Sequence, residues 1–197
     1  MPPAQPRPAN DAFVNIALGG LVAVVAFGGV LAAVSFGFSP NEVIIFGIAL
    51  NVVAGVSTII AGRLDDRFGA RAVIVSALVI LIVSALFVFL FREEGKLVFW
   101  VGGIVLSAAV GPAQASSRSL LARVAPDDMQ GEVFGLYATT GRAVSFLSPT
   151  LFGLTIGLGA LVTTGGSAQH WGILGIVAVL LVGLVVASFV KDPSRVA

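Results

Sequence analysis

The sequence predicts an all-α membrane protein, and three observations carry that prediction. Of the 197 residues, 57% are hydrophobic and only 11% are charged, whereas about 25% of the residues of an average soluble domain are charged. The apolar residues gather in six runs, each long enough for the roughly 20 residues that a helix needs to cross a ~30 Å hydrocarbon core. The connections between the runs are too short to hold a soluble domain. We therefore expect six transmembrane helices and nothing else folded.

The six runs set the expected organisation of the chain. A proline-rich lead-in, residues 1–12, is expected to be disordered because proline excludes a helix there. The apolar run after it is longer than the 7–15 residues of a signal-peptide core, so the first span should stay in the mature protein. A short tail, residues 191–197, ends the chain. The bundle covers residues 13–190, with spans at about 13–36, 43–61, 72–91, 97–117, 133–158 and 171–190.

Local sequence signals mark the breaks between spans. Ser39 and Glu42 have the spacing of a capping box, and Pro40 stands at the first helical position, so the second span should begin sharply after a tight turn. The first two helices are then an antiparallel hairpin. The fifth span should begin with an interfacial turn near Asp128, and Pro149 is expected to kink it.

Basic residues predict the orientation. If the amino terminus is cytoplasmic, eight of the eleven basic residues fall on that side and two on the other, which is a strong positive-inside signal. The eight are Arg7, Arg63, Arg67, Arg71, Arg118, Arg123, Lys191 and Arg195, and the two are Arg92 and Lys96. The eleventh, Arg142, lies inside the fifth span. Both termini should therefore be cytoplasmic.

Composition excludes several classes of function. The chain has no cysteine and a single histidine, so thiol chemistry, disulfides and a zinc site are poor hypotheses. The net charge of +1 argues against a nucleic-acid partner. An intramembrane protease is disfavoured because there is no Gly-x-Ser-x-Gly and His170 stands at the end of a loop. A channel is disfavoured because no loop is long enough to re-enter. We expect no enzyme activity, no cofactor and no metal.

Two spans carry a stripe of small and polar residues on one helix face. In the second span these residues are Gly47, Asn51, Gly55, Thr58 and Gly62, and in the fourth they are Gly103, Ser107, Gly111, Gln114 and Arg118. Small residues let helix backbones approach closely in lipid, so one interpretation is that both stripes are packing seams. The other is that Asn51 and Gln114 also line a cavity.

The fifth span holds a cation at membrane depth. Arg142 there costs about 2.5–3.5 kcal/mol on the insertion scale, so it should face protein or water. It either reaches the interface or neighbouring carbonyls, or binds an anion or carboxylate through its planar fork of donors. The candidate substrate-binding residues are Arg142, Gln114, Asn51, Tyr137 and Ser145. No acidic residue lies in the interior of a span, so any coupling carboxylate belongs to another chain.

The connection after the second span carries the sharpest motif. Residues 62–71 read Gly-Arg-Leu-Asp-Asp-Arg-Phe-Gly-Ala-Arg and resemble the Gly-x-Leu-x-Asp-Arg-x-Gly-x-Arg loop of the major facilitator superfamily. The positions on pattern are Gly62, Leu64, Asp66, Arg67, Gly69 and Arg71. A gating loop is expected here, with Gly62 allowing close helix packing, Gly69 making the turn and Asp66 accepting hydrogen bonds or a salt bridge.

Further strings resemble the vacuole-effluxer-like branch of that superfamily, relatives of the fungal autophagy permeases. They are Asn10-Asp11, Leu64–Arg67, Gly111–Arg123, Phe134–Ala138 and Gly141-Arg142. The resemblance covers the chain from Asn10 to Val190. Family members have twelve spans in two six-helix halves, each a 3+3 inverted repeat, and these signatures belong to the second half. The resemblance implies alternating access with the substrate near the bilayer midplane, and amino acids leaving the vacuole in the fungal relatives.

The expected function is transport. We expect a secondary carrier for a small solute, such as an amino acid or another carboxylate-bearing or anionic metabolite, working as one half of a split or truncated carrier. Its partners would be membrane lipid and a second six-helix half, or a second copy in a homodimer. The alternative is a non-transporting six-helix scaffold or a decayed half-transporter. Nine Arg against two Lys and an Ala/Gly/Val-rich composition suggest a GC-rich bacterial genome, hence a bacterial inner membrane.

Overall fold

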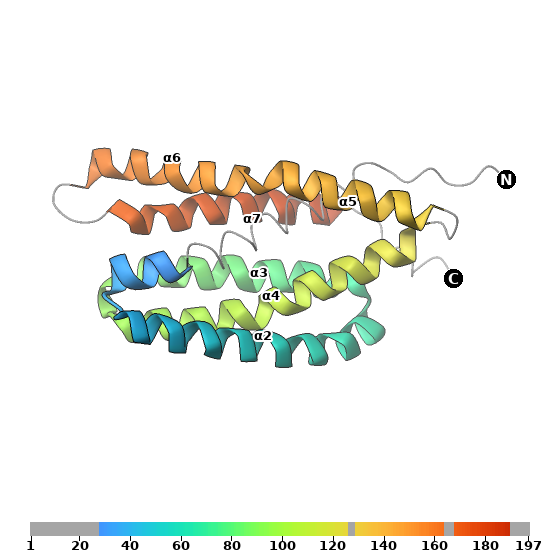
Figure 1. Cartoon of the computed structure of the whole chain (residues 1–197), viewed down its shortest axis with the longest axis horizontal. Helices are drawn as coiled ribbons and strands as arrows, with labels where there is room; N and C mark the ends of the chain where they lie inside the picture. Colours follow the sequence, from blue (N-terminus) through green and yellow to red (C-terminus); the bar gives the residue numbers. More distant parts are fainter. Residues whose placement is uncertain (1–27, 126–128, 164–167, 190–197) are drawn as a thin grey trace.

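The computed structural model describes residues 28–125, 129–163 and 168–189, and every regular element in these ranges is a helix. Residues 28–36 are helical, and two short 3-10 turns, Arg92–Glu94 and Ala168–Trp171, precede α4 and α7. The longer helices are α2 Pro40–Phe68, α3 Ala70–Leu90, α4 Lys96–Val124, α5 Gln130–Ser145, α6 Leu147–Val162 and α7 Gly172–Phe189. Their axes run roughly along one direction, so the elements form an up-and-down bundle (Figure 1).

Four helices among the described residues are long and apolar enough to cross a membrane: Pro40–Phe68, Ala70–Leu90, Lys96–Arg123 and Ala168–Ser188. They agree with the second, third, fourth and sixth expected spans. The first expected span is described only from residue 28 onward, while the lead-in 1–12 and the tail 191–197 lie outside the described residues. The total of six spans therefore stays a prediction.

The fifth expected span, 133–158, coincides with α5 and α6, which are separated by the single residue Phe146. α5 ends at Ser145 and α6 begins at Leu147. The physical reason is Pro149, which has no N–H to donate to the carbonyl of Ser145. The ladder resumes where the N–H of Thr150 donates to the Phe146 carbonyl at 3.1 Å. The kink expected from Pro149 thus appears as a one-residue break in the helix, three residues before the proline.

Helices also extend beyond the apolar runs. The connection expected at 62–71 is almost entirely helical, because α2 continues to Phe68 and α3 begins at Ala70. Only Gly69 lies between them, with φ +86°, a conformation that favours glycine. Likewise, α4 continues to Val124 instead of ending near 117. An apolar run marks the part of a helix that suits lipid, and polar residues beyond it remain able to propagate the helix.

The capping box at the start of α2 is confirmed. The hydroxyl of Ser39 accepts from the Glu42 N–H at 3.3 Å, and the Ser39 N–H donates to the Glu42 carboxylate at 2.7 Å. Pro40 occupies the first turn. The first four backbone positions of a helix have no carbonyl partner for their N–H groups. Here two of those N–H groups, of Ser39 and Glu42, are bonded by side chains, and Pro40 has none to satisfy, so the start of α2 is fixed at this point.

The core lies between α3, α4 and α7, and α2 lies at its edge. The fully buried side chains include Ile74, Leu78 and Leu81 of α3 and Leu180 of α7. About half of the most apolar stretch of α3 and of the α7 region is buried, against 6% for α2. Figure 1 shows α2 beside α4, on the far side of the bundle from α6 and α7. One broad face of α2 is consequently left without a helix from the described residues.

Candidate functional site

The small-residue stripe of α4 is a packing seam against α2. A Cβ at Gly103 would collide with the Phe46 ring, and one at Gly111 would lie 2.5 Å from the carbonyl oxygen of Ala54. Between them the Ser107 hydroxyl donates to the carbonyl of Leu50. Glycine at these positions therefore lets the two helices approach closely, as small residues do in membranes. Of the two interpretations of this stripe, the structure supports the seam for Gly103, Ser107 and Gly111.

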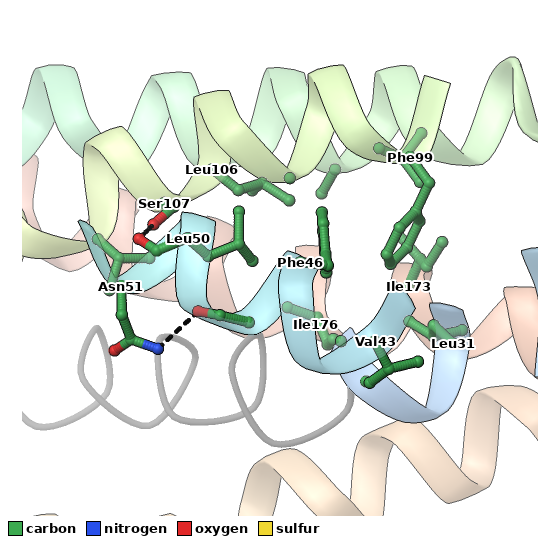
Figure 2. A pocket seen from close by; sticks show the side chains of 17 residues that line it. Leu31, Val43, Phe46, Leu50, Asn51, Phe99, Leu106, Ser107, Ile173 and Ile176 are labelled. Carbon is green, nitrogen blue, oxygen red and sulfur yellow. Dashed lines mark hydrogen bonds between the residues drawn. The ribbon is translucent and has the colours of Figure 1, made fainter. Parts of the chain in front are cut away.

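A pocket of about 240 Å³ opens beside this seam. Its lining is almost wholly apolar, with side chains from α2, α3, α4, α7 and the helical residues 28–36 (Figure 2). The lining residues are Gly28, Gly29, Leu31, Val43, Phe46, Gly47, Leu50, Asn51, Ala85, Val88, Phe99, Gly103, Leu106, Ser107, Val110, Ile173 and Ile176. Asn51 thus borders a cavity as well as a stripe, whereas Gln114 does not line this pocket.

The pocket suits apolar groups and not anions. Ser107 is engaged with the Leu50 carbonyl, and the Asn51 amide nitrogen donates to the Gly47 carbonyl at 2.8 Å (Figure 2). Among the described residues that line the pocket there is no cationic side chain. A buried anion without a charge partner is costly. A carboxylate-bearing solute would therefore need contacts elsewhere in the protein.

An ion-pair cluster joins α2 to α4 at the end of the seam that lies away from the pocket. We call it the Asp65 end. Arg123 of α4 donates to the Asp65 carboxylate at 3.4 Å and lies 3.8 Å from the Asp66 carboxylate. The Asp65 side chain is 7% exposed, whereas that of Asp66 is 81% exposed. One arginine thus compensates a buried and an exposed acid that are adjacent in the chain.

A second ion pair lies at the start of both helices, which we call the Glu42 end. The Lys96 ammonium is 2.8 and 2.9 Å from the two carboxylate oxygens of Glu42, and it also lies 5.5 Å from the centre of the Phe38 ring. Beneath it five aromatic rings contact one another, those of Phe36, Phe38, Phe46, Phe99 and Trp100. This end of the seam is held by apolar packing below an exposed charge pair.

Comparison with known proteins identifies the family. The model of the Major Facilitator Superfamily matches residues 12–197. The chain belongs to the Major Facilitator Superfamily. It is 28% identical, over 156 residues and 79% of its length, to the uncharacterized MFS-type transporter YxiO of Bacillus subtilis. It is 30% identical, over 135 residues and 68% of its length, to the probable transporter SCO4007 of Streptomyces coelicolor.

Membership of this superfamily accounts for the general properties of the chain. It is an all-helical, multi-pass membrane protein of a transporter family, and proteins of this superfamily are not enzymes. The matched region spans about a third of the Bacillus relative and about a quarter of the Streptomyces one, 34% and 27% of their lengths. Most of the length of each relative therefore has no counterpart in these 197 residues.

The superfamily-type motif at 62–71 is mostly a helix end. Gly69 makes the turn, as predicted. Gly62 is exposed, and a Cβ there would meet no described atom within 4 Å, so the close packing expected at this glycine is not observed among the described residues. Leu64 is also exposed. Close packing at Gly62 therefore stays a prediction.

The two arginines that match the motif pattern, Arg67 and Arg71, have different neighbours. The guanidinium of Arg67 lies 5.4 Å from the centre of the Phe68 ring. Arg71 donates to the carbonyl of Ser188 at 2.7 Å, which joins the start of α3 to the end of α7. A cation at a helix C-terminus is favourable because the last carbonyls lack intrahelical donors. Arg71 is therefore a link between two helices of the bundle.

The motif pattern points to Asp66 and gives no sign of the ion pair between Asp65 and Arg123. Asp66 is the acid on the motif pattern, but Asp65 is the buried one. The burial of Asp65 follows from the extension of α2 through the motif. Asp65 follows Ala61 by four residues, and both lie on the buried face of that helix. Four-residue spacing places side chains on one side of a helix.

The predicted substrate-binding residues are not brought together within the described part of the chain. Tyr137 is half-buried on α5 and packs against the small cluster containing Leu121 and Val133. Gln114 is half-buried on α4. Arg142 and Ser145 belong to α5, but their side chains lie outside the described residues. Of the three candidates whose side chains the structure describes, only Asn51 lines the pocket.

Proposed function

We propose that this chain is one six-helix half of a secondary carrier that moves a small solute by alternating access. The observation that carries the proposal is the superfamily match over residues 12–197 in a chain that aligns with only a third of a relative named as a transporter. Transporter folds of this kind bind substrate near the bilayer midplane between repeats. A second half would complete the site, and the vacuole-effluxer-like strings favour that branch of the superfamily.

We further propose that the solute carries a carboxylate or another anionic group, as amino acids do. Arg142 supports this, because its backbone position on α5 is four residues before the interruption at Phe146. Interrupted helices at membrane depth are typical of substrate sites in carriers. The apolar lining of the described pocket gives an anion no partner, so the arginine is the chain's best candidate for that contact. Gln114, Asn51, Tyr137 and Ser145 remain candidate polar contacts.

The proposed orientation puts both termini in the cytoplasm of a bacterium, with the Asp65 end inside and the Glu42 end outside. The test is labelling of single cysteines in intact cells with an impermeant thiol reagent, since the chain has no native cysteine. Cysteines at Ser39 and Gly95 should react, and one at Phe68, which is 56% exposed at the Asp65 end, should not. Labelling at Phe68 in place of Ser39 would invert the topology.

Gating is proposed for the exposed acid of the Asp65 end. Asp66 is 81% exposed and 3.8 Å from Arg123, so its carboxylate is accessible to a partner half. A contact made in only one state biases the equilibrium between states. In assembled carrier, Asp66→Ala should therefore shift cysteine accessibility toward the inward-open pattern. An unchanged pattern would leave Asp66 without a gating role.

Flux in liposomes tests transport itself. Radiolabelled amino acids would be offered to the chain alone and to the chain with a candidate first half from an adjacent reading frame, or to the continuous polypeptide where the two are joined. Flux is expected only with both halves. Arg142→Ala should abolish it while membrane insertion is retained, and Arg142→Lys should restore little, because a point charge does not reproduce a planar fork. Absence of flux from every assembly would favour the scaffold alternative, and wild-type flux by the alanine variant would remove Arg142 from the site.

A further inference from the structure

We infer that the pocket beside the α2–α4 seam is a binding site for a small, neutral ring compound with one hydrogen-bond donor, a ligand other than the anionic solute of the proposed function. The pocket has a volume of about 240 Å³. Its position in the bundle, its size and its one free polar group each restrict what it can hold.

The pocket lies within the bundle formed by this chain. α3 lines it with Ala85 and Val88, and α7 lines it with Ile173 and Ile176, all four of which belong to the buried core. Figure 2 shows the two isoleucines together with lining side chains of α2 and α4. Carriers bind their solute at the interface between repeats. Here the occupant would instead contact four helices of one bundle.

The volume sets the size of the ligand. An apolar cavity of roughly 150 Å³ lined by Leu, Ile and Phe stays dry and binds benzene. In the same proportion, 240 Å³ holds roughly nine or ten ring atoms, as in two fused rings. Phe46 and Phe99 lie in the wall with their ring centroids 5.2 Å apart. Aromatic walls favour an aromatic ligand, because ring pairs gain energy beyond the area that they bury.

One polar group of the wall remains free to bind a ligand. The amide nitrogen of Asn51 donates to the Gly47 carbonyl at 2.8 Å, whereas its carbonyl oxygen makes no hydrogen bond with a described residue. The Ser107 hydroxyl already donates to the carbonyl of Leu50. A carbonyl oxygen only accepts hydrogen bonds. The Asn51 oxygen therefore favours a ligand that carries an N–H or an O–H.

Charged ligands and lipid tails suit this pocket poorly. The described lining residues include neither a cation nor an acid. An ion of either sign would therefore lie among apolar side chains without a partner, which is costly. A lipid acyl chain has no donor for the Asn51 oxygen and is longer than two fused rings. A neutral fused-ring compound with one N–H meets all three restrictions.

Photolabelling with azidoindole tests the site, because indole has two fused rings, no charge and one N–H. The full 197-residue chain is labelled in lipid nanodiscs, and the labelled peptides are sequenced. Gly47→Phe fills the pocket from α2. Gly55→Phe is the matched control: a Cβ at either glycine would meet no described atom within 4 Å, but Gly55 does not line the pocket. Both variants must first show the wild-type unfolding transition; otherwise leucine replaces phenylalanine at both positions.

We expect saturable adducts on the lining peptides of α2 and α4. Gly47→Phe should reduce them at least about tenfold and Gly55→Phe less than about twofold, because a packed interior does not accommodate two groups in one space. Unlabelled indole should compete, and indole carboxylate should not. N-methylindole, which lacks the donor, should compete about five- to tenfold more weakly than indole. In Asn51→Leu this preference for indole should disappear.

Four outcomes would overturn the inference. They are labelling that does not saturate, as partition into lipid gives; equal loss of adducts in the two phenylalanine variants; no adducts on the lining peptides; and stronger competition by indole carboxylate than by indole, which would make the pocket part of the anion site. Labelling needs neither a second half nor a solute gradient. A chain that binds indole without carrying solute would therefore keep this site and lose the proposed function, and flux without labelling would do the reverse.

Discussion

Different interactions hold α2 and α4 together at the two ends of this helix pair. Each end has an ion pair between the helices, Glu42 with Lys96 and Asp65 with Arg123. At the Glu42 end both charged side chains are about equally exposed, 40% and 44%, and an aromatic cluster is packed beneath them. At the Asp65 end the carboxylate is 7% exposed.

The difference teaches where charge matters in this bundle. An exposed ion pair contributes little because water solvates both partners when it breaks. A buried carboxylate that loses its partner has no such compensation. We therefore expect the Glu42 end to depend on its rings and the Asp65 end to depend on its arginine, and the following variants test that contrast in order of expected effect.

The largest effect is expected from Phe46→Ala. The ring is 3% exposed, fills the space over Gly103, and contacts Phe99 and Trp100. Removing a buried phenylalanine costs roughly 3–5 kcal/mol through lost burial and the cavity left behind. Denaturant unfolding in detergent micelles, followed by Trp100 fluorescence in a Trp171→Phe background, measures it. A loss under about 1 kcal/mol would mean that the aromatic cluster does not hold the Glu42 end.

Arg123→Ala should be next. Breaking a buried pair by removing one partner costs about 3–5 kcal/mol, and we expect roughly the lower limit because Arg123 itself is 41% exposed. The control is the double variant with Asp65→Asn, which removes the stranded charge and should recover most of the loss. Equal instability of the single and double variants would show that packing of the arginine stem, and not the charge pair, is what α2 loses.

Gly111→Ala should cost about 1–3 kcal/mol, the usual range for overpacking. Its Cβ would lie 2.5 Å from the Ala54 carbonyl oxygen, so α2 and α4 must separate. Gly55→Ala is the matched control on the other stripe, where the Cβ meets no described atom. The readout is the same denaturant unfolding transition, measured on the chain without a partner. Similar losses of unfolding free energy from both variants would mean that α4 is no more tightly packed around Gly111 than α2 is around Gly55.

Sequence predicted the parts of this structure that are decided locally. The capping box of Ser39 and Glu42 follows from side chains three residues apart, and Pro149 interrupts its own helix whatever surrounds it. The apolar runs located four described spans because hydrocarbon thickness imposes their length. These features need no knowledge of neighbouring helices.

Sequence could not decide which face of α2 packs on α4. In water a polar face marks the exposed side of a helix, but in a membrane both faces are apolar, and α2 exposes isoleucines as large as the side chains it buries. The same ambiguity hid Asp65, since the burial of one of two adjacent acids depends on that face. The candidates Arg142 and Ser145 were chosen by depth in the membrane, and whether they meet Asn51 depends on tertiary packing.

The smallest effect is expected from the exposed ion pair of the Glu42 end. Lys96→Met keeps an unbranched apolar stem beside Phe38 and removes only the ammonium, and Glu42→Gln keeps a residue that can complete the capping box with Ser39. Because water can solvate either partner when the pair is broken, neither change should move the unfolding midpoint beyond experimental error. The two variants check each other, since Lys96→Met leaves the cap untouched and Glu42→Gln leaves the lysine in place. A loss from Lys96→Met as large as that from Arg123→Ala would mean that charge, and not the aromatic cluster, closes both ends of the seam.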